Sequence, residues 1–277
     1  MIGTMHDNTP PPPGVDTTRP SPARMYDYAL GGKDNYQVDR EAGSKILAVA
    51  PGMAELATYN RAWLRRVVRY LCQQGIGQFI DIGSGLPTVE NVHEVAQRHR
   101  AGARVVYVDH EPTVHVHARA LLDGDEGTEF VLADARDPDA VLNADETTRL
   151  IDWSEPTGLI LASVLHFFGD AADPAGTAAR LAERLPAGSF VAVSHASSER
   201  SAPELRARLD AVYRGASEYL YLRPRGDIAG IVDAVTASVG RWEMVEPGLV
   251  PVQDWRPDED VPPPPLTILG AMVRRVA

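Results

Sequence analysis

Residues 79–88 read FIDIGSGLPT, and this stretch decides the fold class of the 277-residue chain. An apolar run leads directly into a turn that holds Gly83 and Gly85, as expected for a buried strand followed by a turn and a helix. A second apolar run, residues 105–108, ends at Asp109, near the spacing of about 20 residues expected between a glycine turn and a ribose-binding acid. This order predicts a nucleoside-binding crevice at the carboxyl ends of parallel strands.

Two classes of nucleoside ligand fit this pattern, and the glycines help to separate them. A dinucleotide fingerprint has a third glycine where its helix receives a pyrophosphate, but here Thr88 stands at that position, preceded by Pro87. S-adenosylmethionine (SAM) has no pyrophosphate, so its loop tolerates bulkier residues. Residues 81–85, DIGSG, resemble the first motif of class I SAM-dependent methyltransferases. An NAD(P)-dependent oxidoreductase and a structural turn without a ligand remain as alternatives.

Hydrophobic periodicity predicts three helices before this strand and an alternation of strands and helices after it. We expect helices at residues 21–30, 39–50, 54–74, 112–122, 174–185, 203–217 and 226–239, and strands at 78–82, 105–108, 130–133, 159–164, 189–194, 242–250 and 267–276. Alternation implies a parallel sheet, and a final strand pair joined without a helix allows a reversed last strand. The expected fold class is α/β and Rossmann-like, of the class I methyltransferase type. Its seven-stranded, mostly parallel sheet has an antiparallel last strand and an N-terminal helical cap.

The composition limits the partners and the compartment. The net charge is −11, and an acidic surface repels phosphate backbones, so we expect no nucleic acid partner. No apolar run is long enough to span a bilayer, and the polar, proline-rich start lacks a signal-peptide pattern. Cys72 is the single cysteine, which fits a reducing compartment. The sequence therefore predicts a cytoplasmic protein with no membrane contact, and the histidines and carboxylates show no metal-ligand spacing.

Motifs spread along the chain resemble one bacterial family. They are RPSPARMYDY at 19–28, LGGKDN at 30–35, NRAWLRR at 60–66, DIGSGLPT at 81–88, VYVD at 106–109 and LHF at 165–167. The family is the S-adenosyl methyltransferase family long known as a domain of unknown function, and the resemblance runs from about Arg19 to the C-terminus. It implies a class I fold and SAM as the cofactor, but it supplies no substrate. His110 departs from the asparagine or similar polar residue expected after Asp109.

The composition and the predicted helices suggest how the chain is divided. We expect a disordered, proline-rich tail over residues 1–20, an N-terminal helical cap over 21–75 and the SAM-binding core over 76–277. Tyr26 and Gly32 belong to the cap, on a helix end and a glycine loop. They are expected to close over the cofactor and exclude water. The alternative is a helical appendage that packs only for stability.

The methionine portion of SAM is expected to lie against the glycine turn. The backbone amides of Gly83, Ser84 and Gly85 are expected to receive its carboxylate. Asn60 and Arg61, on the helix before the first strand, are expected to reach the same carboxylate, since a guanidinium pairs well with it. A surface salt bridge is the competing interpretation for Arg61.

The nucleoside portion is expected to lie against the next two strand ends. Asp109 is expected to accept hydrogen bonds from both ribose hydroxyls. His110 is expected to flank the adenine, with an exposed loop histidine as the alternative. Asp134 and Ala135 are expected at the adenine amino group and a ring nitrogen. The alternative for Asp134 is a helix N-cap.

The reacting methyl group is expected near Ser163, His166 and Phe167, which end the fourth strand. His166 and His195 are the candidate catalytic residues, because imidazole titrates near neutral pH and can orient an acceptor or take its proton. A structural histidine is the alternative for each. No Asn-Pro-Pro-Tyr-type motif follows the fourth strand, which disfavours transfer to a base nitrogen.

These features predict a SAM-dependent methyltransferase that acts on a small-molecule acceptor by in-line displacement. Such a reaction needs mainly alignment in a water-poor site, so the sequence leaves the acceptor open. A non-catalytic SAM-binding sensor or partner-binding module is the main alternative.

Overall fold

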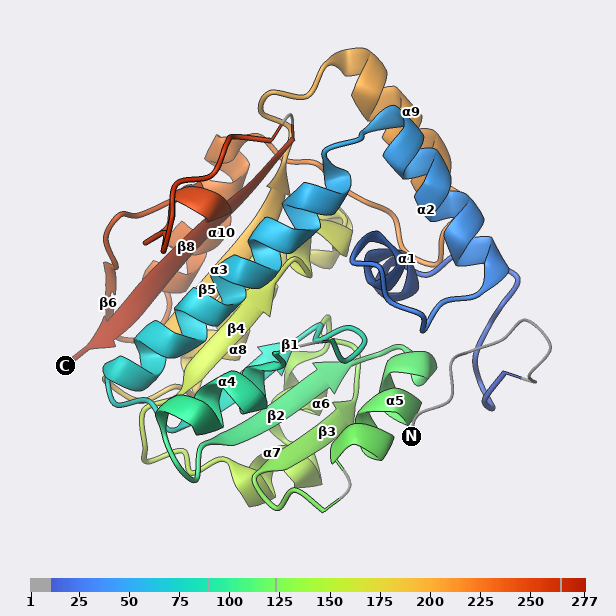
Figure 1. Cartoon of the computed structure of the whole chain (residues 1–277). Coiled ribbons are helices and arrows are strands. Elements are labelled where there is room, and N and C mark those ends of the chain that lie inside the picture. Colours follow the sequence, from blue (N-terminus) through green and yellow to red (C-terminus); the bar gives the residue numbers. More distant parts are fainter. Residues whose placement is uncertain (1–10, 89, 123, 265) are drawn as a thin grey trace.

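The computed structural model describes residues 11–88, 90–122, 124–264 and 266–277. Its centre is a sheet in which the strands run in the order β3-β2-β1-β4-β5-β8-β6, with β7 paired to β8 (Figure 1). The strands are β1 (Gln78–Ile82), β2 (Arg104–Asp109), β3 (Thr128–Leu132), β4 (Gly158–Ala162), β5 (Phe190–Ser197), β6 (Arg241–Met244), β7 (Val250–Pro251) and β8 (Thr267–Val276). Strands β1 to β5 are parallel, and β8 lies antiparallel between β5 and β6. The expected α/β sheet with a reversed last strand is confirmed.

The strand expected over residues 242–250 is the main difference within the sheet. It forms two short strands, β6 and β7, instead of one. Pro247 has no amide hydrogen to donate to the hydrogen-bond ladder of the sheet, and Gly248 has a φ of +85°. The chain therefore turns at these residues, which separate β6 from β7.

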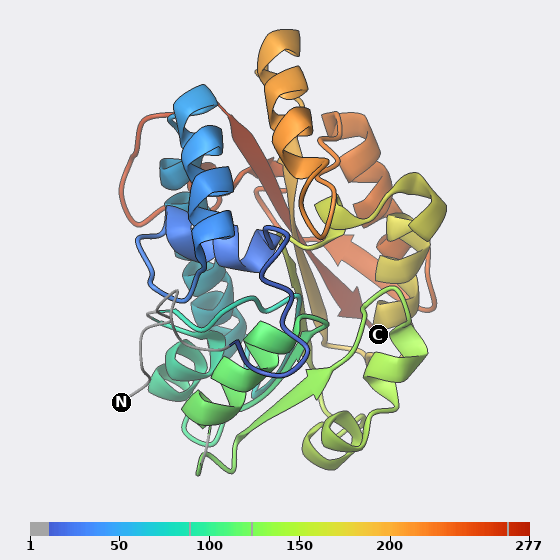
Figure 2. The same ribbon diagram turned by 90° about the vertical axis from the view of Figure 1, so that its right-hand side faces the viewer.

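Helices cover both faces of this sheet and the edge formed by the carboxyl ends of its parallel strands (Figures 1 and 2). They are α1 (Pro22–Ala29), α2 (Gln37–Val49), α3 (Met53–Gln73), α4 (Val92–His99), α5 (Pro112–Leu122), α6 (Pro138–Leu142), α7 (Asp145–Leu150), α8 (Pro174–Glu183), α9 (Pro203–Tyr213) and α10 (Arg225–Thr236). Sequence analysis did not predict α6 and α7, because five or six residues are too few to show a helical period.

The two faces of the sheet carry separate apolar clusters. On β1, Phe79 belongs to the cluster that includes Trp63 of α3, whereas its neighbour Ile80 belongs to the cluster that includes Leu181 of α8. This alternation follows from the two-residue period of a strand. Every residue of β1 is buried because both faces are covered, which is why Phe79, Ile80 and Ile82 are all apolar although they point to opposite faces.

Helices α1 and α2 lie beyond the carboxyl ends of the strands, and α2 packs against α9 from the second half of the chain (Figures 1 and 2). Arg24 of α1 fixes this arrangement. Its guanidinium is buried and donates from Nε to Asp39 of α2 at 2.7 Å and from Nη1 to Glu111 at 2.7 Å. The cap is therefore tied directly to the loop that follows β2.

The tail expected to be disordered lies partly outside the described residues, which begin at residue 11. Within the described part, the carbonyl oxygens of Asp16 and Arg19 accept hydrogen bonds from Arg24 Nη2 at 3.0 and 2.8 Å. Arg19 donates in turn to the carbonyl of Ala216. These hydrogen bonds connect residues 16–20 with the buried guanidinium of Arg24 and with the loop after α9.

No helix in the described ranges has both the length and the apolar character needed to cross a membrane.

Candidate active site

A large cavity opens at the carboxyl ends of the parallel strands, beneath α1 and α2. Thirteen of the residues expected to bind the cofactor line it together: Tyr26, Asn60, Arg61, Gly83, Ser84, Gly85, Asp109, His110, Asp134, Ala135, Ser163, His166 and Phe167. Two of the predicted site residues, Gly32 and His195, are not part of its lining. The strand-end loops thus bring together residues that are far apart in sequence, as the fold predicts.

The glycine turn after β1 has the shape that a ligand loop needs. Gly83 and Gly85 have φ values of +68° and +66°, which side-chain-bearing residues rarely adopt. A Cβ on Gly83 would lie 2.5 Å from the side chain of Val164, so this glycine permits close packing with the loop after β4. A Cβ on Gly85 would meet nothing within 4 Å, so open space lies in front of it.

The amides of this turn do not play the expected role. The N–H groups of Gly83 and Ser84 donate to the carbonyl of Val108 at 2.8 and 3.1 Å, and Gly85 N–H donates to Asp109 at 2.9 Å. The three amides hold the turn against β2, so in this structure they are not free to receive a carboxylate. This part of the sequence interpretation is corrected.

Asp109 lies at the end of β2 with its carboxylate turned inward. It is only 8% exposed, and it accepts hydrogen bonds from Gly85 N–H and, at 3.0 Å, from Glu111 N–H. Burial raises the pKa of Asp109, although these backbone hydrogen bonds oppose the shift. A carboxylate oxygen accepts more than one hydrogen bond, so both oxygens retain capacity for ribose hydroxyls.

A group of charged side chains forms the cavity edge at the ends of β2 and β3. Glu218, from the loop after α9, pairs with Arg136 and lies 3.4 Å from Nε2 of His110. Its hydrogen bond raises the pKa of His110. Arg136 also pairs with Asp134 at 3.0 Å, and Asp134 is not a helix cap, because Asp137 caps α6. Sequence analysis missed Glu218, since nothing in its neighbourhood marks it as part of a strand-end site.

A chain of hydrogen bonds connects the cap with β4 and β5. Tyr26 of α1 donates to the carbonyl of Ala57 at 3.0 Å and accepts from Asn60 Nδ2 at 3.4 Å. Asn60 Oδ1 accepts from the Ser194 hydroxyl at 2.8 Å, and that hydroxyl accepts from Ser163 N–H at 3.0 Å. Ser163 has a φ of +57°, an unusual conformation for a serine that turns the chain sharply after β4.

Asp81 is a second site residue that sequence analysis failed to single out. Its side chain lines the cavity from inside β1, where burial raises its pKa to about 7 despite the nearby Arg61. Arg61 itself hydrogen-bonds Thr88 across the mouth of the glycine turn, so it is not simply part of a surface salt bridge. The sequence did contain an indication of this role. Burying a carboxylate inside a strand costs free energy, so a carboxylate among the apolar residues of a buried strand is a candidate functional residue.

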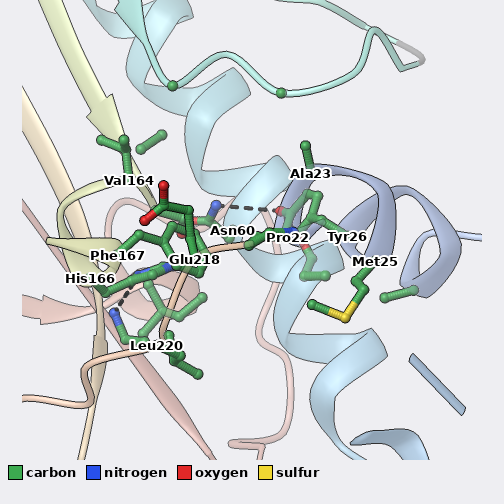
Figure 3. Close-up of a pocket in the computed structure, with 18 of the residues that line it drawn as sticks. Pro22, Ala23, Met25, Tyr26, Asn60, Val164, His166, Phe167, Glu218 and Leu220 are labelled. Atoms are coloured by element: carbon green, nitrogen blue, oxygen red, sulfur yellow. Dashed lines mark hydrogen bonds between the residues drawn. The ribbon is translucent and has the colours of Figure 1, made fainter. Parts of the chain in front are cut away.

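His166 lies on the wall of the cavity after β4, opposite the cap. Its Nδ1 accepts a hydrogen bond from the backbone N–H of Ala196 at 3.2 Å, and its ring stands edge-on to Phe167 with the centroids 4.4 Å apart. Burial lowers the pKa of His166 well below its ordinary value, so the ring is neutral at physiological pH. Figure 3 shows His166, Phe167 and Leu220 on one side of the pocket and Met25 and Tyr26 of α1 on the other.

His195 does not belong to the site, which corrects the sequence interpretation. It is fully buried, its Nδ1 donates to the carbonyl of Ala196 at 2.8 Å, and its Nε2 accepts from Arg223 at 3.1 Å. Both ring nitrogens are occupied, and burial lowers the pKa of His195 to about 4. His195 is therefore a structural histidine.

Gly32 also has a structural role instead of a cofactor contact. A Cβ at this position would lie 1.9 Å from a carboxylate oxygen of Asp27. The carboxylate of Asp27 holds the loop after α1 by accepting from Asp34 N–H at 2.9 Å and from the Asn35 side chain at 2.8 Å. Gly32 is needed for this close approach.

The part of the cavity between the cap and α9 is apolar. Its walls include Met25, Ile46, Met53, Leu209 and Tyr213. We call this part the apolar chamber. Across the described ranges, no group of three or more histidine, cysteine, aspartate or glutamate side chains is arranged to hold a metal ion.

Comparisons with known proteins agree with this architecture. A family model described as S-adenosyl methyltransferase matches residues 8–275. The structure of a Thermobifida fusca protein described provisionally as a methyltransferase is 37% identical, with a TM-score of 0.87, covering 96% of this chain and 99% of that one. A DUF574 family protein from Streptomyces avermitilis is 35% identical with a TM-score of 0.86, covering 94% and 99%.

A more distant structure shares the fold alone. It is an O-methyltransferase family protein from Burkholderia thailandensis, 12% identical with a TM-score of 0.50, covering 91% of this chain and 64% of that one. No curated protein has significant similarity to the chain.

Proposed function

The chain belongs to the S-adenosyl methyltransferase family, and we propose that it transfers the methyl group of SAM to a small molecule held in the apolar chamber. The observation that carries this proposal is the continuity of one cavity. It runs from the nucleoside-type end at Asp109 and the glycine turn to the chamber beneath α1 and α2. A cofactor and a small acceptor can therefore meet inside the protein.

The residues present fit SAM. The open space in front of Gly85 gives room for the ligand beside a buried carboxylate, Asp109, whose oxygens suit ribose hydroxyls. Ala135 and His110 flank the position expected for the adenine. When bound, SAM supplies a methyl group activated by a positively charged sulfur.

The amino-acid end of SAM needs partners for both of its charges. Because the amides of the glycine turn are occupied, we assign the carboxylate of SAM to Arg61. We assign its ammonium group to Asp81, which lies close enough to Arg61 for the guanidinium to lower the Asp81 pKa. These two opposite charges at one end of the cavity match an amino acid zwitterion.

The cap excludes water from the reaction. Tyr26 and Met25 of α1 form the wall facing His166 and Phe167 (Figure 3), and Arg24 anchors that helix to Glu111 beside the ribose position. Displacement at a sulfonium methyl group needs alignment and a dry site more than it needs a strong base.

Turnover distinguishes this proposal from a SAM-binding sensor. Incubating the protein with SAM and a small-molecule extract should release S-adenosylhomocysteine (SAH), measured by mass spectrometry, above the level in a protein-free control. The Asp109→Ala variant should release no more SAH than that control. SAM binding without turnover across broad extracts would favour the sensor.

A further inference from the structure

The hydrogen bond to His166 determines which ring nitrogen carries its proton. A backbone N–H can only donate, so Nδ1, which accepts from Ala196 N–H at 3.2 Å, is unprotonated. The ring is neutral, and its proton must therefore be on Nε2. Among the described residues, Nε2 has no hydrogen-bond partner and is not among the polar atoms sealed from solvent, so it remains accessible from the cavity.

This tautomer makes His166 a donor toward the acceptor molecule and not a base. To accept a proton at Nε2, the neutral ring would have to move its own proton to Nδ1, where the amide of Ala196 opposes it. An acceptor atom facing His166 must then supply one lone pair to the Nε2–H group and another to the methyl group. A neutral amine has a single lone pair and cannot do both, whereas an anionic oxygen can.

The apolar chamber restricts the rest of the acceptor molecule. The charged side chains of the cavity lining lie on α3, on β1, at the end of β2 and on the strand-end loops. Glu218 comes from the loop after α9 and pairs with Arg136 of a strand-end loop. Asp27 of α1 is the other exception, and its carboxylate is occupied by Asp34 N–H and Asn35. Tyr213 adds an aromatic wall, with its ring centroid 6.4 Å from that of Phe167.

We propose that the acceptor is an apolar, ring-sized molecule bearing an acidic oxygen, a phenol or a carboxylic acid, that reacts as its anion while His166 Nε2–H holds that oxygen. This assignment rests on the proposed function. A lone pair of the oxygen forms the new O–C bond as the C–S bond breaks, and the electron pair of that bond goes to sulfur. The products are a methyl ether or ester and neutral SAH, and no proton has to be removed by the protein.

Binding to the SAH-loaded protein tests the assignment without requiring the natural substrate. The probes are 2-naphthoate, 2-naphthol, 2-naphthamide and 2-naphthylmethylamine, which share one apolar ring system and differ in the polar group. Calorimetry at pH 8 should show naphthoate binding about tenfold or more tighter than the amide, as expected for a hydrogen bond to a charged group. The cationic amine should bind weakest of the four.

The pH dependence of naphthol affinity distinguishes a phenolate acceptor from a carboxylate acceptor. The affinity for naphthol should rise as the pH approaches the naphthol pKa if phenolates are held, whereas naphthoate affinity should stay flat over the same range. A rise identifies a phenolate site. A flat naphthol profile, with naphthoate still preferred over the amide, identifies a carboxylate site.

Two variants of His166 test the contribution of its Nε2–H donor separately from that of its Nδ1 acceptor. In His166→Asn the side-chain oxygen can replace Nδ1 as the partner of Ala196 N–H, but no donor remains at the Nε2 position. In His166→Gln a donor remains near Nε2. The naphthoate preference should disappear in the asparagine variant and survive in part in the glutamine variant. Calorimetry of SAH binding to each variant sets the SAH concentration used, so that the probes are compared on protein saturated with SAH.

Nitrogen-15 NMR of the histidine rings provides a second readout. The signal that disappears in His166→Asn should belong to a ring protonated at Nε2. A ring protonated at Nδ1, equal affinities for naphthoate and naphthamide, tighter binding of the amine, or no binding of any probe would overturn the assignment. Failure of the protein to bind SAH would instead overturn the proposed function.

Discussion

Asp81 is a carboxylate held inside the central strand of the sheet, with a pKa raised to about 7 by burial. If it pairs with the ammonium group of SAM, binding requires its ionised form. The affinity for SAM should then fall about tenfold as the pH decreases from 8 to 6, the loss expected about one unit below this pKa. Calorimetric titrations across this range test the expectation.

Asp81→Asn is the control for that profile. The variant should bind SAM more weakly at pH 8 and lose most of the slope. Glu218 raises the pKa of His110 above its ordinary value, so only the difference between the two profiles reports on Asp81. An unchanged slope in the variant would remove Asp81 from the site.

The same carboxylate should affect stability in the absence of SAM. Its folded-state pKa lies above its ordinary value of 3.8, so the folded state favours the protonated form. Stability should therefore fall as the pH rises from about 4 to about 7, and Asp81→Asn should recover up to about 4 kcal/mol at pH 8. Urea unfolding at pH 5 and pH 8 measures this; equal stabilities of the variant and the parent protein at pH 8 would contradict it.

Asp109 is expected to hold the ribose. Asp109→Ala removes the acceptor for two hydroxyls and should weaken SAM binding by about 100-fold or more, because hydrogen bonds to charged groups contribute about 1.5–3 kcal/mol each. Asp109→Asn keeps the shape and one acceptor, and it should lose less. Circular dichroism and isothermal titration on both variants check fold and affinity; wild-type affinity in the alanine variant would exclude this role.

Much of the candidate site could be predicted at the residue scale, but not its polar connections. The glycine turn and Asp109 follow from local sequence, because both stand at the end of an apolar run. His195 was misjudged because its ring is satisfied by Arg223, 28 residues later in the chain. The amides of Gly83 and Ser84 were misjudged in the same way, since their acceptor lies on the neighbouring strand.

At the scale of elements, the attachment of α1 to the core is the feature that a single substitution tests most directly. Arg24 connects α1 to Asp39 and Glu111, and its side chain is 3% exposed. Arg24→Ala leaves the Asp39 carboxylate buried without its partner and should cost about 3–5 kcal/mol of unfolding free energy. Chemical denaturation followed by circular dichroism measures the loss.

The matched control is an exposed ion pair far from the cap. Arg149 pairs with Glu129, and the arginine side chain is 59% exposed. Arg149→Ala should cost less than about 1 kcal/mol. Equal losses in the two variants would show that the Arg24 network does not anchor the cap.

Element boundaries could be predicted best where the periodicity is strong. The strands Gln78–Ile82 and Thr267–Val276 agree to the residue, because each is a mostly buried run that follows a break in the apolar pattern. The strand expected at 189–194 is Phe190–Ser197, since its pairing with β8 continues past the apolar run into polar residues. Tertiary pairing of this kind leaves no trace in local sequence.

At the scale of the whole molecule, the fold brings two halves of the chain together around one cavity. The nucleoside-type end comes from the loops after β1, β2 and β3, whereas the apolar chamber is lined by residues of α1 and α2 from the N-terminus and of α9. Figure 2 shows α2 and α9 side by side. The alternation of strands and helices in the sequence predicted the nucleoside-type end of this cavity. The packing of α2 on α9 is a contact between distant segments that the sequence pattern does not encode.

A crystal structure of the protein with SAH tests the central claim most directly. The ribose hydroxyls should lie within hydrogen-bond distance of the Asp109 carboxylate, and the sulfur should face the apolar chamber near His166. Density for SAH elsewhere, or with its sulfur turned away from that chamber, would contradict the account.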